Sequence, residues 1–328
     1  MILPRGEGIE GGMEAPESNL LNGELAGQLC FRLGDLETYL LSPTQFAGLA
    51  EWLGETRARC YRHVSPHGPE RMDLDGRDHH YWHLLVMDRK RRQLAGSLRM
   101  ALSRRHRKDW SGEFSYLEHC YPGLDEAMAE AGLAYAEIGR TFVAPPYQRT
   151  SRVLLVLLQA MVSIPLATGH SQLLGMVSYN HFEVSEPLQR AFLQALLQPP
   201  CPGGLTVPPP RHPLPLAEAV AGGPPAHHAT LAELETDLER RFAQPFRAPI
   251  LLRRYMQYGN ARVLALSLAR DFNQITEILM HADLGLLQES QRSMLVVPHL
   301  QPVWERDASF SESVPGEAAA DTAPECGG

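Results

Sequence analysis

The 328-residue sequence predicts an α/β fold of the α+β type, in which helices flank one mixed, mostly antiparallel central sheet. Three observations predict this class. Strand-like and helical segments follow one another without strict alternation, two neighbouring strand-like runs are joined by a short charged turn, and two more strand-like runs close the ordered part. Glycine-rich dinucleotide and phosphate-loop fingerprints are absent, which weighs against the use of NAD or nucleotides.

The first half of the chain supplies most of the predicted sheet. Residues 29–33 alternate as a short strand, and Ser42 and Thr44 are N-cap candidates for a helix over about 45–62. The remaining elements expected here are strands 81–88 and 93–102 joined by the turn 89–92, a strand over 134–143, and a helix over 147–164. Apolar residues recur at helical spacing in the last of these, at Leu154, Leu157, Leu158 and Met161.

The second half is interrupted by a segment over 199–228 that is dense in proline and glycine. The elements predicted around it are a strand over 172–179, helices over 187–197, 230–242 and 250–258, and strands over 262–268 and 275–281. Thr230 and Glu233 form a capping box, and Gly259 ends the following helix. We therefore expect a disordered tail over 1–25, a domain over 26–284 with a Pro-rich insertion at 199–228, and an extension over 285–328 that is disordered from about 309.

Composition and charge exclude several classes of function. Apolar content of 44% and charged content of 21% are ordinary for a soluble domain, and the net charge of -8 argues against nucleic acid as a partner. No secretory signal or long apolar span is visible. Five scattered cysteines include no C-x-x-C pair, and no ligand set surrounds the histidines at 79, 80 and 83, so we expect no metal site. A reduced cytoplasmic protein is predicted.

The segment 135–149 carries the strongest functional signal, because it is a strand that ends in two prolines and leads into a long helix. Glu137 and Arg140 are three residues apart and would point to opposite faces of a regular strand. Gly139 between them can host a bulge that turns both side chains to one side. Two interpretations remain open, namely a carboxylate that accepts a proton from an amine, or a salt bridge that pins the sheet.

Two further groups surround this strand in the sequence. The carboxylates in the segment 73–78 could bind a cationic substrate or a hard metal, although the other ligands of a Ca²⁺ loop are missing, or they could form a solvated turn. The segment 147–151 begins the long helix, where backbone N–H groups together with Arg149 and Arg152 would suit a phosphate. The alternative for this second group is an ordinary polar helix start.

A run of four basic side chains, Arg89, Lys90, Arg91 and Arg92, lies in the hairpin turn of an otherwise acidic chain. If the strand over 134–143 pairs antiparallel with the strand over 93–102, this basic turn falls near the start of the long helix. Its charge would then steer an acidic carrier protein towards that helix. A solvated turn is the alternative.

Taken together, the motifs resemble the acyltransferase branch of the GNAT superfamily, which includes ornithine-lipid-forming N-acyltransferases, N-acyl amino acid synthases and haemolysin-like proteins. Acyl-homoserine lactone synthases are more distant relatives. Four ordered motifs carry the resemblance: Arg57-x-x-x-Tyr61, Asp75-x-x-Asp78 followed by Trp82–Asp88, Gly96-Ser-Leu-Arg99, and Glu137–Val143. The later stretches Gly175–Asn180, Ile250–Gly259 and Asp271–Asn273 resemble the haemolysin-like group.

This resemblance implies a GNAT-like sheet with a splayed strand, and transfer of a fatty acyl group, commonly 3-hydroxylated, from acyl carrier protein to an amino acid such as ornithine. Glu137 would be the general base, or would orient the water that acts as base, and Arg140 and Arg99 would hold the electrostatic frame. Asp75, Asp78 and Arg57 would form and support the substrate entrance. A backbone N–H near Phe142 or Val143 would stabilise the oxyanion.

The sequence departs from the GNAT pattern at the turn that usually holds the coenzyme A pyrophosphate. Gln148, Arg149, Thr150, Ser151 and Arg152 occupy that turn, and none of them is glycine. Because a carrier protein presents one phosphate on its phosphopantetheine arm, this loss favours acyl carrier protein as the donor, with no other cofactor. A lipid product would allow peripheral contact with the inner face of the membrane.

Two alternatives to this function stay open. One is a signal synthase of the acyl-homoserine lactone type that uses S-adenosylmethionine. The other is a non-catalytic GNAT-fold module that binds lipid or a partner.

Overall fold

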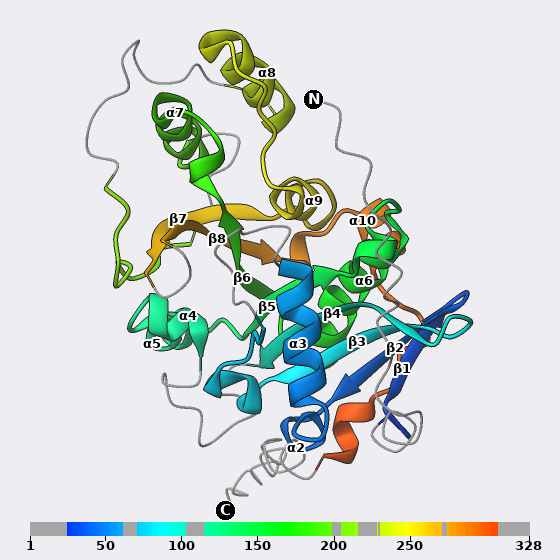
Figure 1. The fold of residues 1–328 in the computed structure, drawn as a ribbon. Helices are drawn as coiled ribbons and strands as arrows, with labels where there is room; N and C mark the ends of the chain where they lie inside the picture. The colour runs from blue at the N-terminus through cyan, green and yellow to red at the C-terminus, as the bar shows by residue number, and fades with distance from the viewer. Residues whose placement is uncertain are drawn as a thin grey trace, which may run out of the picture.

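The computed structural model describes residues 25–61, 71–102, 115–198, 205–215, 228, 230–270 and 274–307. Its centre is one eight-stranded sheet with the order β1-β2-β3-β4-β5-β6-β8-β7 (Figure 1). The strands are β1 (Leu29–Leu33), β2 (Leu36–Leu41), β3 (Trp82–Asp88), β4 (Gln93–Leu102), β5 (Tyr135–Val143), β6 (Gln172–Tyr179), β7 (Arg262–Ala269) and β8 (Ile275–Asp283). Among these described strands, β5 and β6 are the parallel pair and all other neighbours are antiparallel. The predicted mixed, mostly antiparallel fold class is confirmed.

Helices cover both faces of the sheet. The first face carries α2 (Pro43–Phe46), α3 (Ala50–Tyr61), α4 (Tyr116–Cys120), α5 (Leu124–Glu130) and the 3-10 turn η1 (Gly76–His80). The second face carries α6 (Arg152–Ala167), α7 (Glu186–Leu196), α8 (Leu231–Phe242), α9 (Ile250–Gly259) and α10 (Glu289–Leu295). Short 3-10 turns lie at Pro145–Tyr147, His181–Glu183, Leu284–Leu286 and Val303–Arg306.

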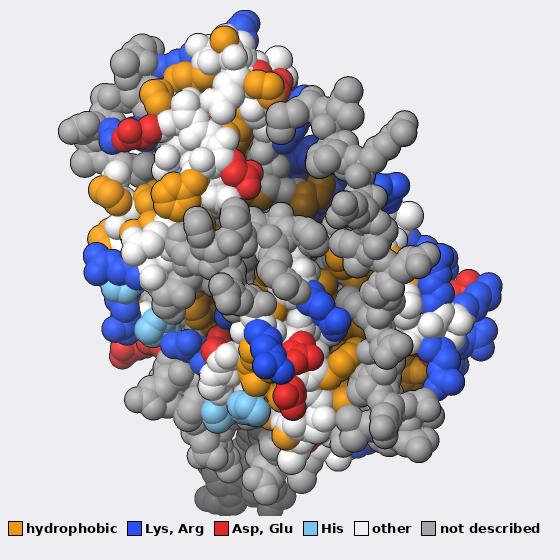
Figure 2. Space-filling model, viewed as in Figure 1, with side chains coloured by type: hydrophobic (Ala, Val, Ile, Leu, Met, Phe, Trp, Pro, Cys, Tyr) orange, Lys and Arg blue, Asp and Glu red, His pale blue; other side chains and the backbone are white. Residues whose placement is uncertain are grey.

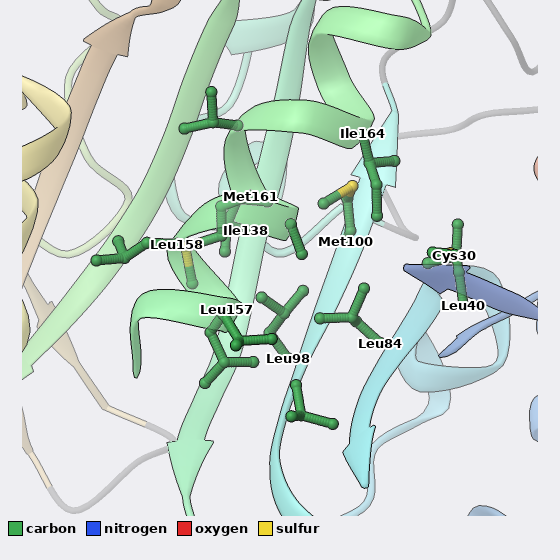
Figure 3. Close-up of a cluster of buried hydrophobic side chains, with 14 of the residues drawn as sticks. Cys30, Leu40, Leu84, Leu98, Met100, Ile138, Leu157, Leu158, Met161 and Ile164 are labelled. Atoms are coloured by element: carbon green, nitrogen blue, oxygen red, sulfur yellow. The ribbon is translucent and has the colours of Figure 1, made fainter. Parts of the chain in front are cut away.

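The main core lies between the sheet and α6. Figure 3 shows the strand side chains of this core facing the helix, and the residues involved are Leu84, Leu98, Met100 and Ile138 from the strands, and Leu157, Leu158, Met161 and Ile164 from α6. Complete burial of such a side chain stabilises the fold by roughly 1.5–3 kcal/mol each. This core fixes β4 and β5, the two strands that carry the charged residues of the site.

The segment 284–307 returns to the opposite edge of the sheet. After α10 packs on α6, the backbone N–H of Gln301 donates to the carbonyl oxygen of Cys30 on β1 at 2.8 Å. Val303 and Trp304 are buried in the same core as α6. The first strand therefore depends on the last described segment for part of its cover.

Several element boundaries differ from the sequence prediction. The helix expected over 45–62 is two helices, α2 and α3, and the helix expected over 147–164 begins at Arg152. Pro145 and Pro146 start a 3-10 turn that delays it, since proline fixes the backbone and lacks an N–H. The residue with left-handed geometry after α9 is Asn260 (φ 52°), so Gly259 belongs to the helix.

Two strands beside the expected site depart from regular pairing. Ser97 pairs with Phe142 and Arg99 pairs with Gly139, so β5 has one extra residue in a bulge, where Arg140 adopts a left-handed φ of 50°. The pairing of β5 with β6 extends from Tyr135 only to Ile138 opposite Gly175. Beyond that point the two strands part, which confirms the splayed strand.

Gly175 permits the last close contact before the strands part. A Cβ atom at this position would lie 2.7 Å from the carbonyl oxygen of Ile138, too close for any side chain without a backbone shift. Glycine at this position therefore lets β5 and β6 pair up to the split.

Within the Pro-rich insertion, the structure describes residues 205–215 and residue 228. There Pro213 forms a bridge with Ser267 of β7, and Arg211 N donates to the carbonyl of Cys120 at 2.7 Å. The tails predicted over 1–25 and from 309, the rest of the insertion and the Asp271–Asn273 stretch lie almost entirely outside the described residues. None of the described helices combines the length and the apolarity needed to cross a bilayer.

Candidate active site

Glu137 on β5 is a buried carboxylate with a defined set of hydrogen-bond donors. Only 3% of it is exposed, and its Oε1 accepts from the Tyr81 hydroxyl at 2.6 Å. Its Oε2 accepts from the Ser115 hydroxyl at 2.7 Å. Burial raises the pKa of Glu137, and the hydrogen bonds from Tyr81 and Ser115 offset only part of that rise. The side chain is therefore oriented and has an elevated proton affinity.

A buried ionic cluster near this carboxylate is formed by Arg57, Asp78 and Arg99. The Arg57 guanidinium binds the two Asp78 oxygens at 2.8 and 2.7 Å, and Arg99 Nη1 binds Asp78 Oδ1 at 3.0 Å. Burial opposes ionisation of Asp78, but the hydrogen bond from Arg57 and the charges of both arginines outweigh it and lower its pKa. Arg57 also donates to the backbone carbonyl of Asp73, so it ties α3 to the loop before η1.

Arg140 is directed to the same loop. Its guanidinium pairs with Asp73 Oδ1 at 3.1 Å and with Asp75 Oδ2 at 3.2 Å. The sequence left a salt bridge with Glu137 open as an alternative, but among the described residues Arg140 pairs with these two aspartates. The left-handed backbone at Arg140 points its side chain at the loop, on the same face of the sheet as Glu137. The bulge anticipated at Gly139 is present one residue later.

Asp75, which lines a cavity beside Glu137, has a double role. It caps η1 by accepting from the N–H groups of Arg77 and Asp78 at 2.9 and 3.2 Å. It also accepts from Arg99 Nη1 at 3.2 Å. Aspartate is a strong N-cap because its oxygens satisfy N–H groups that lack helical partners. The solvated turn considered from the sequence is instead a half-buried, ion-paired turn.

A cavity of about 740 Å³ opens beside Glu137. Residues of both sheet faces line it, because β5 and β6 part there. The polar side chains on its lining include those of Asp75, Arg77, Arg99, Tyr116, Glu137 and Glu277. The apolar side chains, which come mainly from α6, α9 and β8, include Leu154, Leu158, Met161, Val162, Tyr255 and Met280. The cavity thus combines charged side chains beside Glu137 with a largely apolar remainder of the lining.

The splayed part of β5 also directs a backbone donor into this cavity. Ala144 N–H donates to Ala95 on the β4 side at 2.9 Å, and the Val143 carbonyl, on the other side, accepts from Gln148 at 2.9 Å. Because successive peptide groups alternate along a strand, the N–H of Val143 faces the gap left by β6. Of the two oxyanion donors expected from the sequence, this alternation favours Val143.

Residues 56–159 match the family model described as an acetyltransferase (GNAT) domain. This range contains β3, β4, β5 and the start of α6, and therefore Glu137, Arg140 and the ionic cluster. Acyl transfer is the reaction class that the match supports. No curated protein matches the chain.

Solved structures to which the chain is similar include two acyl-homoserine lactone synthases and one N-acyl amino acid synthase. The CoA-dependent synthase BjaI, solved with SAM and isopentyl-CoA, is 12% identical, with 84% of this chain and 96% of BjaI covered and a TM-score of 0.43. LasI is 11% identical, with 80% and 96% covered and a TM-score of 0.38. FeeM, from uncultured soil microbes, is 8% identical, with 66% and 74% covered and a TM-score of 0.31.

The turn that follows β5, residues 148–152, lies partly on the cavity lining and partly on the surface. Gln148 and Thr150 line the cavity. Arg149 and Ser151 are exposed, and Arg152 donates to the carbonyl of Leu33, the last residue of β1, at 3.0 Å. A phosphate role for all five residues of this turn stays a prediction, and Gln148 and Thr150 are the two placed beside the reaction space.

The basic turn between β3 and β4 lies next to this turn, as the sequence predicts from the antiparallel pairing. The Arg91 guanidinium stacks 5.6 Å from the Tyr147 ring centroid, and Lys90 pairs with Asp35 at 3.0 Å. Arg89 and Arg92 are exposed. Figure 2 shows Lys and Arg side chains gathered at the right, where Figure 1 places the tips of the two N-terminal hairpins.

Sequence reasoning missed four residues that shape the site: Tyr81, Ser115, Tyr116 and Glu277. Ser115 and Tyr116 begin α4, a helix of five residues that is too short for a periodic signal. Tyr81 precedes β3, and its contact with Glu137 spans 56 residues. One signal was available, because Ser115 precedes Glu118 at the spacing of a capping box.

Proposed function

We propose that this protein is an N-acyltransferase that moves a fatty acyl group, preferably 3-hydroxylated, from acyl carrier protein to the amino group of an amino acid such as ornithine. The product would be an N-acyl amino acid or a lyso-ornithine lipid. The observation that carries the proposal is the position of Glu137, a buried carboxylate with a raised pKa, at the lining of a cavity of about 740 Å³ with an apolar interior.

The reaction needs a base, a positioned thioester and an oxyanion donor. The acceptor amine attacks the thioester carbonyl, the new C–N bond forms, and the amine proton passes to Glu137 directly or through a water. The N–H of Val143 stabilises the developing oxyanion. The C–S bond then breaks, and the proton held by Glu137 returns to the leaving pantetheine thiolate, so the enzyme ends unchanged.

The donor is inferred from three features. The cavity interior is lined by Leu, Met and Val side chains of α6 and β8, which suits a long acyl chain. The turn 148–152 lacks the glycines that would let a backbone enclose a pyrophosphate. The adjacent basic turn over 89–92 suits an acidic carrier that presents a single phosphate.

Release of free carrier thiol tests the proposal. Pure protein is incubated with 3-hydroxyacyl carrier protein and a panel of amino acids, and the thiol and the product mass are followed. We expect thiol release only with an amine acceptor, and a product mass equal to acyl chain plus amino acid. A Glu137→Ala variant that releases thiol as fast as the parent would refute the mechanism. Tight carrier binding without turnover would favour a binding module, and a lactone product would favour a signal synthase.

A further inference from the structure

Glu277 on β8 is a second buried carboxylate on the wall of the same cavity. Only 4% of it is exposed, and its Oε1 accepts from the Tyr116 hydroxyl at 2.7 Å. It pairs across the sheet with Ser178, on the stretch of β6 that has already left β5. The proposed acyl transfer gives this carboxylate no role.

Arg77 lies on the other side of the same tyrosine. Its guanidinium stacks 5.7 Å from the Tyr116 ring centroid and lines the cavity. Its Nε is buried and has no hydrogen-bond partner among the described residues. A desolvated guanidinium donor without an acceptor is costly unless a ligand supplies one. Arg99 Nε is also without a partner, but Arg99 pairs with Asp75 and Asp78 through its Nη1, whereas the Arg77 guanidinium forms no ion pair among the described residues.

Tyr116 also connects these two groups to the proposed base. Its backbone N–H donates to the Tyr81 hydroxyl at 2.8 Å, and that hydroxyl donates to Glu137 at 2.6 Å. Glu137, Arg77 and Glu277 are therefore all connected to Tyr116: the guanidinium lies over its ring, the second carboxylate accepts from its hydroxyl, and the base is linked to its backbone N–H through the Tyr81 hydroxyl.

We propose that Arg77 and Glu277 bind the two charged ends of the acceptor, a class that we infer to be amino acids with a second, cationic amino group. Arg77 binds the α-carboxylate of the acceptor, because a guanidinium matches a carboxylate with two parallel hydrogen bonds. Glu277 binds the side-chain ammonium, and the α-amine is left beside Glu137. The inference rests on the proposed function, since it assigns the acceptor of that same reaction.

Acceptor selectivity tests the assignment of Glu277. Glu277→Gln keeps an oxygen that can accept from Tyr116 but removes the charge. We expect kcat/KM for ornithine to fall about 10²-fold in this variant, as for loss of a buried charge partner, while kcat/KM for norvaline, which has no side-chain amine, stays unchanged. Glu126→Gln on exposed α5 is the matched control and leaves both acceptors unaffected. Equal losses with both acceptors, or no loss, would overturn the assignment.

Ornithine and ornithine amide test Arg77 in the same way. The parent enzyme should prefer the free acid, and Arg77→Gln should lose that preference with little change in kcat/KM for the amide. An undiminished preference for the acid in the variant would overturn the role of Arg77.

Calorimetric titration with ornithine, which needs no acyl donor, separates this inference from the proposed function. In one outcome the parent binds ornithine, Glu277→Gln does not bind it, and the parent shows no turnover. This outcome refutes the acyl transfer but supports the binding site. In the other outcome the parent acylates other amines, does not bind ornithine and does not prefer ornithine to norvaline. This outcome refutes the binding site but supports the acyl transfer.

Discussion

The hydroxyl of Tyr81 donates a hydrogen bond of 2.6 Å to Oε1 of Glu137 and accepts one of 2.8 Å from the backbone of Tyr116. Burial raises the pKa of Tyr81 well above its ordinary value, and the charge of Glu137 adds to the rise. The phenol therefore stays protonated near neutral pH, and it donates to the carboxylate. Tyr81 fixes the direction in which the lone pairs of Glu137 face the cavity.

Replacement of Glu137 by glutamine should remove the base while keeping the shape of the site. We expect kcat/KM to fall by about 10²–10⁴-fold, the range for loss of a positioned general base. The thermal midpoint should stay equal or rise, because an amide is cheaper to bury than a carboxylate. Thiol-release kinetics and thermal unfolding check the two expectations, and a variant that retains parental activity would contradict the role.

Replacement of Tyr81 by phenylalanine should shift the pH profile. Glu137 must be ionised to accept a proton, so activity rises with pH through its pKa, which is already raised. The Tyr81 hydrogen bond stabilises the ionised form, and its loss raises that pKa further. The acidic limb of kcat/KM therefore moves to higher pH. Tyr135→Phe is the control, since its hydroxyl donates to Asp125; an acidic limb that stays in place in Tyr81→Phe would argue against this coupling.

Replacement of Asp78 by asparagine should destabilise the fold. Asp78 is completely buried between Arg57 and Arg99, so its loss leaves two buried guanidinium groups short of a counter-charge and costs roughly 3–5 kcal/mol. Because the folded-state pKa of Asp78 is lowered, its contribution is present above the unfolded pKa of about 3.9 and is lost as pH falls through that value and below.

Urea unfolding at neutral and acidic pH measures this effect. The parent should lose stability on acidification more steeply than Asp78→Asn does. Asp35→Asn is the matched control, because Asp35 pairs with Lys90 at the exposed hairpin tips, and we expect it to leave the unfolding midpoint nearly unchanged. If the free energy of unfolding of the parent and that of Asp78→Asn fall equally steeply on acidification, the explanation is wrong.

Two glycines in the splayed strands should respond differently to alanine. At Gly175 a Cβ would lie 2.7 Å from the Ile138 carbonyl oxygen, so the strands must separate, at a cost of roughly 1–3 kcal/mol. At Gly139 the nearest atom to a Cβ is Arg99 Nε at 3.5 Å, an ordinary contact. We expect Gly175→Ala to lower both stability and activity and Gly139→Ala to keep the parental stability. Similar unfolding midpoints for the two variants would disprove the steric argument.

Charge reversal in the basic turn should affect carrier-bound donors only. In the double variant Arg89→Glu, Lys90→Glu, we expect KM for acyl carrier protein to rise at least tenfold at low salt. The dependence of this KM on salt concentration should weaken. KM for an acyl-pantetheine without carrier should not change. Arg240→Glu with Arg241→Glu, in the last turn of α8, is the control. An equal rise of KM for both donors would point to a disturbed active site and not to a docking surface.

Much of the sheet could be predicted from the sequence, because its strands carry local signals. The hairpin of β3 and β4 has two apolar runs and a charged turn, and β5, β6, β7 and β8 have apolar runs of strand length. β2 was missed because nearly all of its residues are buried, so it lacks the alternation that marks a half-exposed strand. The long helix was placed too early because its apolar pattern begins before the prolines allow a helix.

The site was predictable only in its charged members. Glu137, Arg140, Asp75 and Asp78 stand out because charged residues next to apolar runs are visible locally. The pairing of Arg140 with Asp73 and Asp75 depends on a single left-handed residue in β5, which no local pattern marks. The hydrogen bonds from Tyr81 and Ser115 to Glu137 join distant segments, so only the folded chain shows them.

The return of the segment 301–306 to the first strand has a consequence for how the protein is made. Cys30 leaves the ribosome early, yet Gln301 and Trp304, which cover that edge, emerge some 270 residues later. At a synthesis rate of about 5–20 residues per second, the edge of β1 stays open for roughly 15–50 seconds. During that time the nascent chain exposes an unpaired strand edge, to which a chaperone that recognises such edges could bind.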